Sequence, residues 1–332
     1  MRSESGTTQM SMTRVYGAGL KMMIKRLLKG FTVPTLKPSK NGAYRPEELR
    51  IRKVGSFDEY KDYASSMIEE YENRLRIEKS IAADRQEFQV GGFCQVCRVA
   101  VDFHVDLQFG YQGQNGRMTP NWRERLTCQY CGLNNRMRAS LHIFDEICNP
   151  DKKSAIYITE QTTPVYERLR ADFVNVAGSE YLGKDILPGR KSLLGIRNES
   201  LTNLTFADDS FDYLLCFDVL EHIPDFEKAL TECFRVLKPG GRFIFSVPFD
   251  LNSPENIVRA SLDHSGDVRH ILPAEYHGDP LSNKGCLCFY HFGWELLDCI
   301  RAKGFGRAEC LFYWSQKYGY LGGDQFIFMA QK

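Results

Sequence analysis

Residues 203–248 read NLTFADDSFDYLLCFDVLEHIPDFEKALTECFRVLKPGGRFIFSVP, and this stretch decides the fold. A continuous apolar run, typical of a buried strand, ends at Phe217. Pro224 suits the first turn of a helix, and apolar residues at helical spacing follow it. The pair Gly240-Gly241 ends that helix, and a second apolar run follows. The stretch therefore predicts two buried strands joined by a crossover helix.

The same alternation continues on both sides of this unit. Strand-like runs occupy residues 155–159, 173–177, 192–196, 213–217 and 242–247, with helices or loops between them. Two more strand candidates, 310–314 and 325–330, are joined by a Gly-rich turn. Strands that alternate with helical segments are typical of a mostly parallel sheet, so the sequence predicts an α/β fold.

Three segments of residues 150–332 carry a family resemblance. The segments LTFADDSFDYLL, DVLEHI and FRVLKPGGRFIFSVP strongly resemble the class I S-adenosylmethionine-dependent methyltransferases. The resemblance implies a doubly wound, Rossmann-like sheet of seven strands whose last strand is antiparallel. It also implies S-adenosylmethionine as cofactor and methyl transfer as the reaction.

The first turn of the expected sheet departs from that family. Residues 155–169, AIYITEQTTPVYERL, contain no glycine where the family usually has a Gly-rich motif. S-adenosylmethionine has no phosphate, and its methionine end presents an ammonium and a carboxylate. Glu160 is expected to meet the ammonium, and the amides that follow it are expected to meet the carboxylate. Thr162 or Thr163 is expected to cap the next helix. We interpret the turn as a rebuilt site, with a lost site as the alternative.

The remaining cofactor assignments follow from the resemblance. An acid after the second strand normally pairs with the ribose hydroxyls, which indicates Glu180, with Tyr181 beside the adenine. Glu199 follows the third expected strand, where the family holds the adenine edge. The alternative for each is a surface loop residue. The full predicted set is Thr159, Glu160, Gln161, Thr162, Glu180, Tyr181, Glu199, Phe217 and Asp218.

Two C-x-x-C pairs precede this domain. Each pair can present two thiolates to one tetrahedral ion, a geometry and chemistry that favour zinc. The predicted ligands are Cys94, Cys97, Cys128 and Cys131. Four thiolates leave no open position, so the predicted zinc is structural; a redox pair or coincidence are the alternatives. Arg136 and Arg138 follow the second pair and either hold an anion or brace the domain junction.

The candidate catalytic residues are His277, His222 and Glu221. Asp218, Glu221 and His222 can share a face at a helix start, and a similar cluster in ubiquinone-pathway O-methyltransferases is tied to a divalent ion. That resemblance makes Mg²⁺ a candidate cofactor, whereas the alternative is that Glu221 and His222 only shape the pocket. His277 lies in a histidine-rich insert expected to form the acceptor wall. It is the preferred base because histidine titrates near neutrality, and a structural histidine is the alternative.

The chain is expected to contain four parts. They are a basic, partly disordered leader at 1–55, a helical segment at 56–90, a zinc ribbon with linker helix at 91–149, and the methyltransferase domain at 150–332. The leader carries twelve Lys and Arg against three Asp and Glu, a net charge of +9 within a chain of net charge +1. The arrangement resembles a smaller bacterial group in which a four-cysteine ribbon precedes such a domain and which is associated with glycans.

The leading functional hypothesis is O-methylation of a small polar acceptor, such as a hydroxyl on a sugar or glycan intermediate. A nucleic-acid methyltransferase that binds through the ribbon is one alternative, but no NPPY-like motif follows the fourth strand. A non-catalytic scaffold is the other. No segment is apolar enough to span a membrane. The eleven cysteines indicate a reducing compartment, hence the cytoplasm. The sequence assigns neither the acceptor nor the oligomeric state.

Overall fold

The computed structural model describes residues 49–82, 85–112, 116, 118–278, 281 and 284–332. The expected leader at 1–55 lies outside the described residues as far as residue 48. Within the described part of the chain, no helix is long and apolar enough to cross a membrane.

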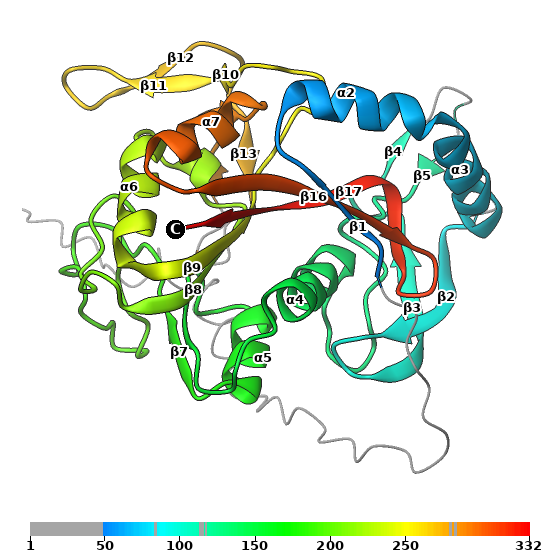
Figure 1. Cartoon of the computed structure of the whole chain (residues 1–332), viewed down its shortest axis with the longest axis horizontal. Helices are drawn as coiled ribbons and strands as arrows, with labels where there is room; N and C mark the ends of the chain where they lie inside the picture. Colours follow the sequence, from blue (N-terminus) through cyan, green and yellow to red (C-terminus); the bar gives the residue numbers. More distant parts are fainter. Residues whose placement is uncertain (1–48, 83–84, 113–115, 117, 279–280, 282–283) are drawn as a thin grey trace, which may run out of the picture.

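A seven-stranded sheet forms the centre of the molecule (Figure 1). Its strands, in spatial order, are β1 (Ile51–Val54), β16 (Arg307–Ser315), β17 (Tyr320–Gln331), β9 (Leu237–Ser246), β8 (Phe211–Phe217), β6 (Ala155–Ile158) and β7 (Asn175–Gly178). The last four are parallel to one another, and β17 is antiparallel to both of its neighbours. The expected α/β sheet with an antiparallel final strand is confirmed.

The sheet is doubly wound, since helices cover both faces (Figure 1). Helices α4 (Asn135–Cys148) and α5 (Pro164–Asp172) pack on one face, and α2 (Phe57–Ser66), α6 (Phe226–Val236) and α7 (Glu295–Ala302) pack on the other. Strand β8 shows why both faces need cover: Leu214 and Cys216 face one core, whereas Leu215 faces the other. Successive side chains of a strand point to opposite faces, so an unbroken apolar run suits a central parallel strand.

Two strands differ from the sequence expectation. Residues 192–196 form a turn in place of the expected third parallel strand, because Gly195 has a φ of 77° and its amide bonds back to Ser192 at 2.9 Å. Leu193 is exposed, so no core draws this run into the sheet. The seventh strand is β1 instead, which lies inside the expected leader and pairs antiparallel with β16. The leader boundary at residue 55 is therefore wrong by at least this strand.

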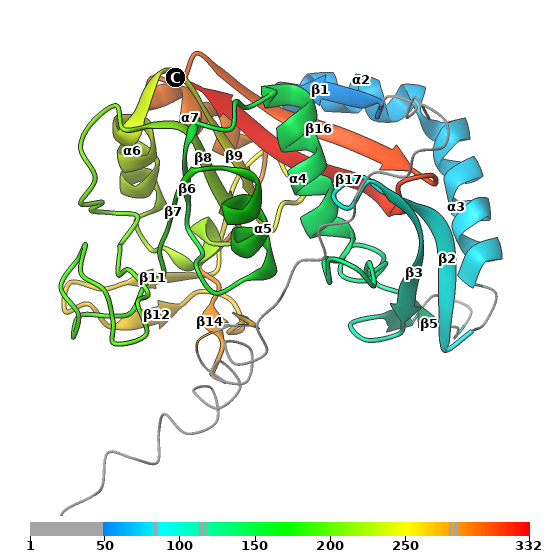
Figure 2. The ribbon, with the colours of Figure 1, turned by 90° about the horizontal axis from the view of Figure 1, so that it is seen from below.

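The N-terminal part packs against the end of the sheet. The expected helical segment is a helix pair, α2 and α3 (Ile68–Ala82), and the hairpin of β2 (Glu87–Cys94) and β3 (Val99–Asp106) follows it. The hairpin has its own core around Phe103 and Trp122, which also includes Leu321 of β17. Figure 2 shows α3, β2 and β3 together at the end of the sheet opposite to α6.

The remaining elements are short. They are β4 (Tyr111–Gln112), β5 (Met118–Thr119), the 3₁₀ turn η1 (Leu220–His222), β10 (Ile257–Val258), β11 (Ala260–Leu262), β12 (Val268–His270), β13 (Tyr276–His277), β14 (Cys286–Leu287) and β15 (Tyr290–His291). Strands β10 to β15 belong to the insert between β9 and α7, and they pair among themselves and not with the main sheet. The insert therefore forms a separate layer beside the ends of the parallel strands.

Candidate cofactor and acceptor site

Three acids lie just beyond the carboxyl ends of adjacent parallel strands. Glu160 follows β6, Glu180 follows β7, and Asp218 follows β8. Strand β6 lies between β7 and β8, so the strand order reverses its direction at β6, which makes this edge a topological switch point. Such a switch point is the usual place for a ligand in an open α/β sheet.

Asp218 is held by two cations from the N-terminal part of the chain. Its carboxylate accepts from Arg123 Nη2 at 3.0 Å and from Ser246 Oγ at 2.7 Å, and Arg136 Nη1 lies 3.1 Å away. Burial acts to raise the pKa of Asp218, but Arg123 and Arg136 outweigh it and hold that pKa well below its usual value. Asp218 is therefore a carboxylate at neutral pH, and the ribbon region supplies its counter-charge.

Arg136 and Arg138 lie on the same helix, α4, but point to different places. Arg136 reaches the strand ends, where it also binds Glu124 through Nε at 3.0 Å. Arg138 is fully buried and donates to the carbonyl oxygens of residues 126, 318 and 319. Its guanidinium carbon also lies 3.8 Å from the centre of the Phe103 ring. Arg138 braces the domain junction, whereas Arg136 belongs to the candidate site.

Glu160 has a carboxylate oxygen without a partner. Its Oε1 atom is buried and has no hydrogen-bond partner among the described residues, and the same is true of Thr159 Oγ1 beside it. Burial, opposed in part by Thr163 and Arg136, raises the pKa of Glu160 to about 7. An unpartnered buried polar atom is costly, so a donor from a ligand would be favourable here. The edge thus offers both guanidinium groups and an unsatisfied carboxylate, a donor set that fits the zwitterionic end of S-adenosylmethionine.

Glu180 stabilises the turn that lacks glycine. Its Oε1 accepts from the amides of Gln161 at 2.7 Å and Thr162 at 2.9 Å, and from the Thr162 hydroxyl at 2.8 Å. The amides expected to meet a cofactor carboxylate are therefore already bonded to Glu180, which corrects that expectation. Thr163 caps α5 by accepting from the Tyr166 amide at 3.3 Å, so one of the two expected caps is confirmed.

The other predicted cofactor residues have different surroundings. Glu199 is buried and its carboxylate accepts from Arg197 Nε at 2.7 Å and the Thr205 amide at 3.0 Å. Both oxygens thus accept hydrogen bonds within the protein, so Glu199 stabilises its own loop, and its contact with the adenine edge stays a prediction. Tyr181 is exposed beside Glu180, and Phe217 is buried at the end of β8.

The four ribbon cysteines come together. Cys94 Sγ lies 3.9 Å from Cys131 Sγ, and Cys97 Sγ lies 3.9 Å from Cys128 Sγ. A disulfide is much shorter, whereas zinc–sulfur bonds of about 2.3 Å give a tetrahedral edge of about 3.8 Å. In each pair, the residue after the second cysteine has positive φ and its amide bonds to the carbonyl of the first. This arrangement fits one tetrahedral ion held by four thiolates.

The three candidate catalytic residues form a second cluster. Glu221 is fully buried in η1, and its Oε1 lies 3.6 Å from His222 Nε2 and 3.5 Å from His277 Nδ1. A hydrogen bond to Cys288 and the neighbouring Glu221 carboxylate raise the pKa of His277 to about 11. This shift favours the protonated ring in the metal-free protein, so His277 would have to lose that proton before it could act as a base, and its catalytic role stays a prediction. Asp218 is bound to Arg123 and Arg136. The structure therefore groups Glu221 and His222 with His277, and not with Asp218 as the expected metal-ligand set did.

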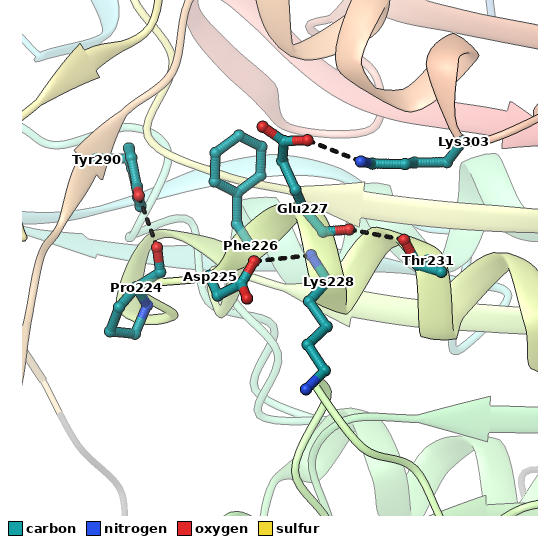
Figure 3. A pocket seen from close by; sticks show the side chains of 8 residues that line it. All are labelled: Pro224, Asp225, Phe226, Glu227, Lys228, Thr231, Tyr290 and Lys303. Carbon is teal, nitrogen blue, oxygen red and sulfur yellow. Dashed lines mark hydrogen bonds and ion pairs between the residues drawn. The ribbon is translucent and has the colours of Figure 1, made fainter. Parts of the chain in front are cut away.

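A hollow of about 510 Å³ lies beside the start of α6 (Figure 3). Asp225 caps α6 by accepting from the Lys228 amide, Glu227 pairs with Lys303 at 2.7 Å, and Tyr290 donates to the Pro224 carbonyl at 2.7 Å. None of the residues predicted from the sequence to bind a cofactor or to act in catalysis lines it. We therefore place the candidate site at the strand ends and not in this hollow.

Comparison with known sequences gives matches to methyltransferases. Residues 161–245 match the family described as "Methyltransferase domain". A probable S-adenosylmethionine-dependent methyltransferase of Mycolicibacterium smegmatis is 45% identical over 53 residues, which are 16% of this chain and 21% of the relative. A demethylmenaquinone methyltransferase of Desulfitobacterium hafniense is 39% identical over 70 residues, 21% of this chain and 24% of the relative. A ubiquinone biosynthesis O-methyltransferase of Pseudomonas fluorescens is 45% identical over 38 residues, 11% and 16% of the two chains. The matches cover less than a quarter of these curated relatives.

The similarity to solved structures is weak. A 1,6-didemethyltoxoflavin N1-methyltransferase of Burkholderia thailandensis, solved with S-adenosylhomocysteine, has a TM-score of 0.37 at 17% identity over 59% of this chain and 77% of its own. A methyltransferase of Mesorhizobium loti has a TM-score of 0.33 at 14% identity over 57% and 97%.

Proposed function

We propose that this chain is an S-adenosylmethionine-dependent methyltransferase that acts on a small polar acceptor. The observation that carries the proposal is the donor set at the carboxyl ends of β6 and β8. Arg136 and Arg123 offer guanidinium groups there, and Glu160 offers a buried carboxylate oxygen without a partner. The α-amino-acid end of the cofactor carries both charges that this set would bind. The methyltransferase-domain match over residues 161–245 supports the same activity.

We assign the cofactor contacts as follows. Arg123 and Arg136 bind the carboxylate of the methionine end, and Glu160 binds its ammonium together with Asp218. Glu180 is fixed by three donors and therefore presents a preorganised carboxylate to the ribose hydroxyls. The list is completed by Tyr181 and Phe217 beside the adenine and by Thr159, Gln161 and Thr162 in the turn. The cofactor supplies a methyl group activated by a sulfonium, so positioning accounts for much of the rate.

We propose a hydroxyl group on a sugar or glycan intermediate as the acceptor. The cluster of Glu221, His222 and His277 supports this because it gathers polar, ionisable side chains just after β8, where an acceptor hydroxyl would need binding and proton removal. The relatives include quinone C- and O-methyltransferases, so a quinol is the comparison acceptor. Nucleic-acid methylation and a non-catalytic scaffold are the alternative outcomes.

We further propose one structural zinc ion on Cys94, Cys97, Cys128 and Cys131, supported by the two 3.9 Å sulfur–sulfur distances. None of the eleven cysteines forms a disulfide. Cysteines without disulfides support the cytoplasm, a reducing compartment, as the location.

The test is transfer of an isotopically labelled methyl group from S-adenosylmethionine. Purified full-length protein is incubated with separate pools of sugar and glycan intermediates, quinols, and RNA, and each pool is examined by mass spectrometry. A labelled sugar or glycan supports the proposal, whereas label only in RNA or quinol overturns the acceptor class. Cofactor binding without any transfer would favour the scaffold.

A further inference from the structure

Glu221 is a buried carboxylate that the protein leaves without a hydrogen bond. Its side chain has no exposed surface, and neither oxygen has a hydrogen-bond partner among the described residues. Its neighbours are the imidazoles of His222 and His277, at 3.6 and 3.5 Å. These distances exceed the 2.7–3.2 Å range of ordinary hydrogen bonds. A buried carboxylate without a hydrogen bond costs free energy, so this position favours a cation, either the protonated His277 ring or a metal ion that replaces its proton.

Each histidine is held so that its free nitrogen faces Glu221. His222 Nδ1 lies 2.9 Å from the carbonyl oxygen of Leu287, which can only accept, so Nδ1 carries the proton and Nε2 offers a lone pair. His277 Nε2 lies 3.0 Å from Glu275 Oε1. The other ring nitrogen of His277, Nδ1, therefore faces Glu221. Two ring nitrogens and one carboxylate oxygen therefore converge on one point from η1 and β13, and a metal ion bound there would displace the proton that His277 holds in the metal-free protein.

The spacing of the three atoms fits a metal ion. Ligand atoms about 2.0–2.1 Å from a tetrahedral zinc ion lie about 3.3–3.4 Å from one another. The two distances measured from Glu221 are close to this value, and all three ligand atoms lie within 4.8 Å of one another. A proton shared between Glu221 and a histidine would instead draw the pair to ordinary hydrogen-bond length.

A second layer of contacts orients the ligands. Glu275 accepts from His277 Nε2 and from His291 Nε2, both at 3.0 Å, and pairs with Arg259 at 3.0 Å. A histidine that bridges a carboxylate and a metal is the usual arrangement in zinc sites. A neighbouring group, Glu275, Cys288 and His291, is a weaker ligand set because Glu275 is already engaged and the Cys288 thiol donates to the Tyr290 carbonyl at 3.1 Å.

We propose that Glu221, His222 and His277 bind a divalent transition-type ion such as Zn²⁺ or Fe²⁺. Two imidazoles and one carboxylate suit these ions, whereas Mg²⁺ prefers an all-oxygen octahedron. Three protein ligands leave coordination positions open, and His277 is only half-buried, which gives an entry path. The site differs from the ribbon, where four thiolates close the coordination shell. The ion would supply Lewis-acid chemistry on the acceptor side, a role that rests on the proposed methyl transfer, whereas its binding does not.

The experiment counts metal ions in the full chain. Wild-type protein is saturated with Zn²⁺ at pH 7.5, freed of loose ions by gel filtration, and analysed by elemental mass spectrometry. We expect two zinc ions per chain in the wild type, and one in Glu221→Gln and in His277→Ala. The matched control His270→Ala removes an exposed histidine of β12 in the same insert and should keep two. Asp218→Asn should also keep two, because Asp218 is not a ligand in this site.

Cobalt substitution separates the two sites by ligand type. Co²⁺ in the ribbon gives strong thiolate charge-transfer absorption, whereas Co²⁺ on Glu221, His222 and His277 adds only weak visible bands. Glu275→Gln should weaken the second ion by roughly 10- to 100-fold through loss of orientation. One ion per chain in the wild type, or an unchanged count in His277→Ala, would overturn the site. S-adenosylhomocysteine binding is measured on each variant as a check on folding. A wild type with two ions and no such binding would overturn the proposed function alone.

Discussion

Asp218 and Glu221 lie three residues apart after the same strand, yet the protein treats their charges differently. Asp218 is neutralised by Arg123 and Arg136 and also accepts from Ser246. Glu221 is more deeply buried and has no hydrogen-bond partner among the described residues. The first acid is paired within the chain, through residues of the ribbon region. The second has the imidazoles of His222 and His277 beside it, at 3.6 and 3.5 Å. The difference places the two acids on different sides of our proposal: Asp218 on the cofactor side, and Glu221 on the metal and acceptor side.

Removal of the ribbon ion should have the largest effect on stability and on cofactor binding, because it would separate both Arg123 and Arg136 from Asp218. Structural zinc contributes about 10–16 kcal/mol of folding free energy in isolated zinc fingers, so Cys128→Ser should unfold the ribbon. We expect a large drop in thermal stability and loss of S-adenosylhomocysteine binding. The control is Cys299→Ser, which lies on α7 outside the ribbon. Normal stability in Cys128→Ser would contradict the structural role of the ion.

Removing the charge of Asp218 should change the free energy of unfolding more than removing the charge of Glu221. Asp218→Asn breaks charge-assisted contacts to two arginines, so it should lower the free energy of unfolding by about 2 kcal/mol. Glu221→Gln, compared with wild-type protein that carries only its ribbon ion, should change it by less than about 1 kcal/mol in either direction because no hydrogen bond is lost. Urea unfolding of both variants at pH 7.5 measures the difference. Equal losses would mean that Glu221 is paired within the protein after all.

The two arginines of α4, Arg136 and Arg138, should differ in whether they contribute to cofactor affinity or to stability. Arg136→Met removes a cation from the cofactor side and should weaken S-adenosylhomocysteine by roughly 10- to 100-fold, the value of a charge-assisted hydrogen bond. Arg138→Met removes three bonds to carbonyl oxygens at the domain junction and should lower stability without changing the affinity of the folded protein. Calorimetry well below the melting temperature compares them. An unchanged affinity in Arg136→Met would remove Arg136 from the cofactor site.

The smallest expected effect is a pH dependence from Glu160. Its pKa is raised to about 7, so the side chain is mostly protonated at pH 6 and mostly charged at pH 8. If the charged form binds the cofactor's ammonium, S-adenosylhomocysteine affinity should rise by roughly tenfold over this interval. The free protein should show the opposite trend. A raised carboxyl pKa stabilises the fold fully below its unfolded value near 4.5, and this contribution is lost as pH rises through about 7. Glu160→Gln should abolish both trends, and a retained pH dependence in that variant would assign them to another group.

The sheet could be predicted from the sequence because its strands carry strong local signals. The stretch that ends at Phe217 and the run before Ser246 are apolar throughout, as a strand covered on both faces must be. The same signal gave a wrong prediction of a strand at residues 192–196. Gly195 forms a turn there, and Leu193 is exposed and does not pack in a core. Strand β1 was missed because IRKV has only four residues, and its place depends on pairing with β16.

The candidate site was only partly predictable, since its charges come from distant segments. Glu160, Glu180 and Asp218 were found because each follows a strand. Arg123 was missed: it lies 95 residues before Asp218, and the dense charged run RER at 123–125 was its one visible signal. Glu221, His222 and His277 were named together as catalytic candidates, but the expected metal-ligand set contained Asp218 in place of His277. The exchange of Asp218 for His277 depends on how the insert folds over η1, which no local pattern encodes.

The central claim is that the turn without glycine, together with Arg123, Arg136 and Glu160, forms a working cofactor site. The most direct measurement is a calorimetric titration of the zinc-loaded wild-type protein with S-adenosylhomocysteine. We expect one binding site per chain with a dissociation constant well below the millimolar range. The absence of binding at millimolar S-adenosylhomocysteine, in protein that is folded and carries its ribbon zinc, would contradict the claim and leave a scaffold with a lost site.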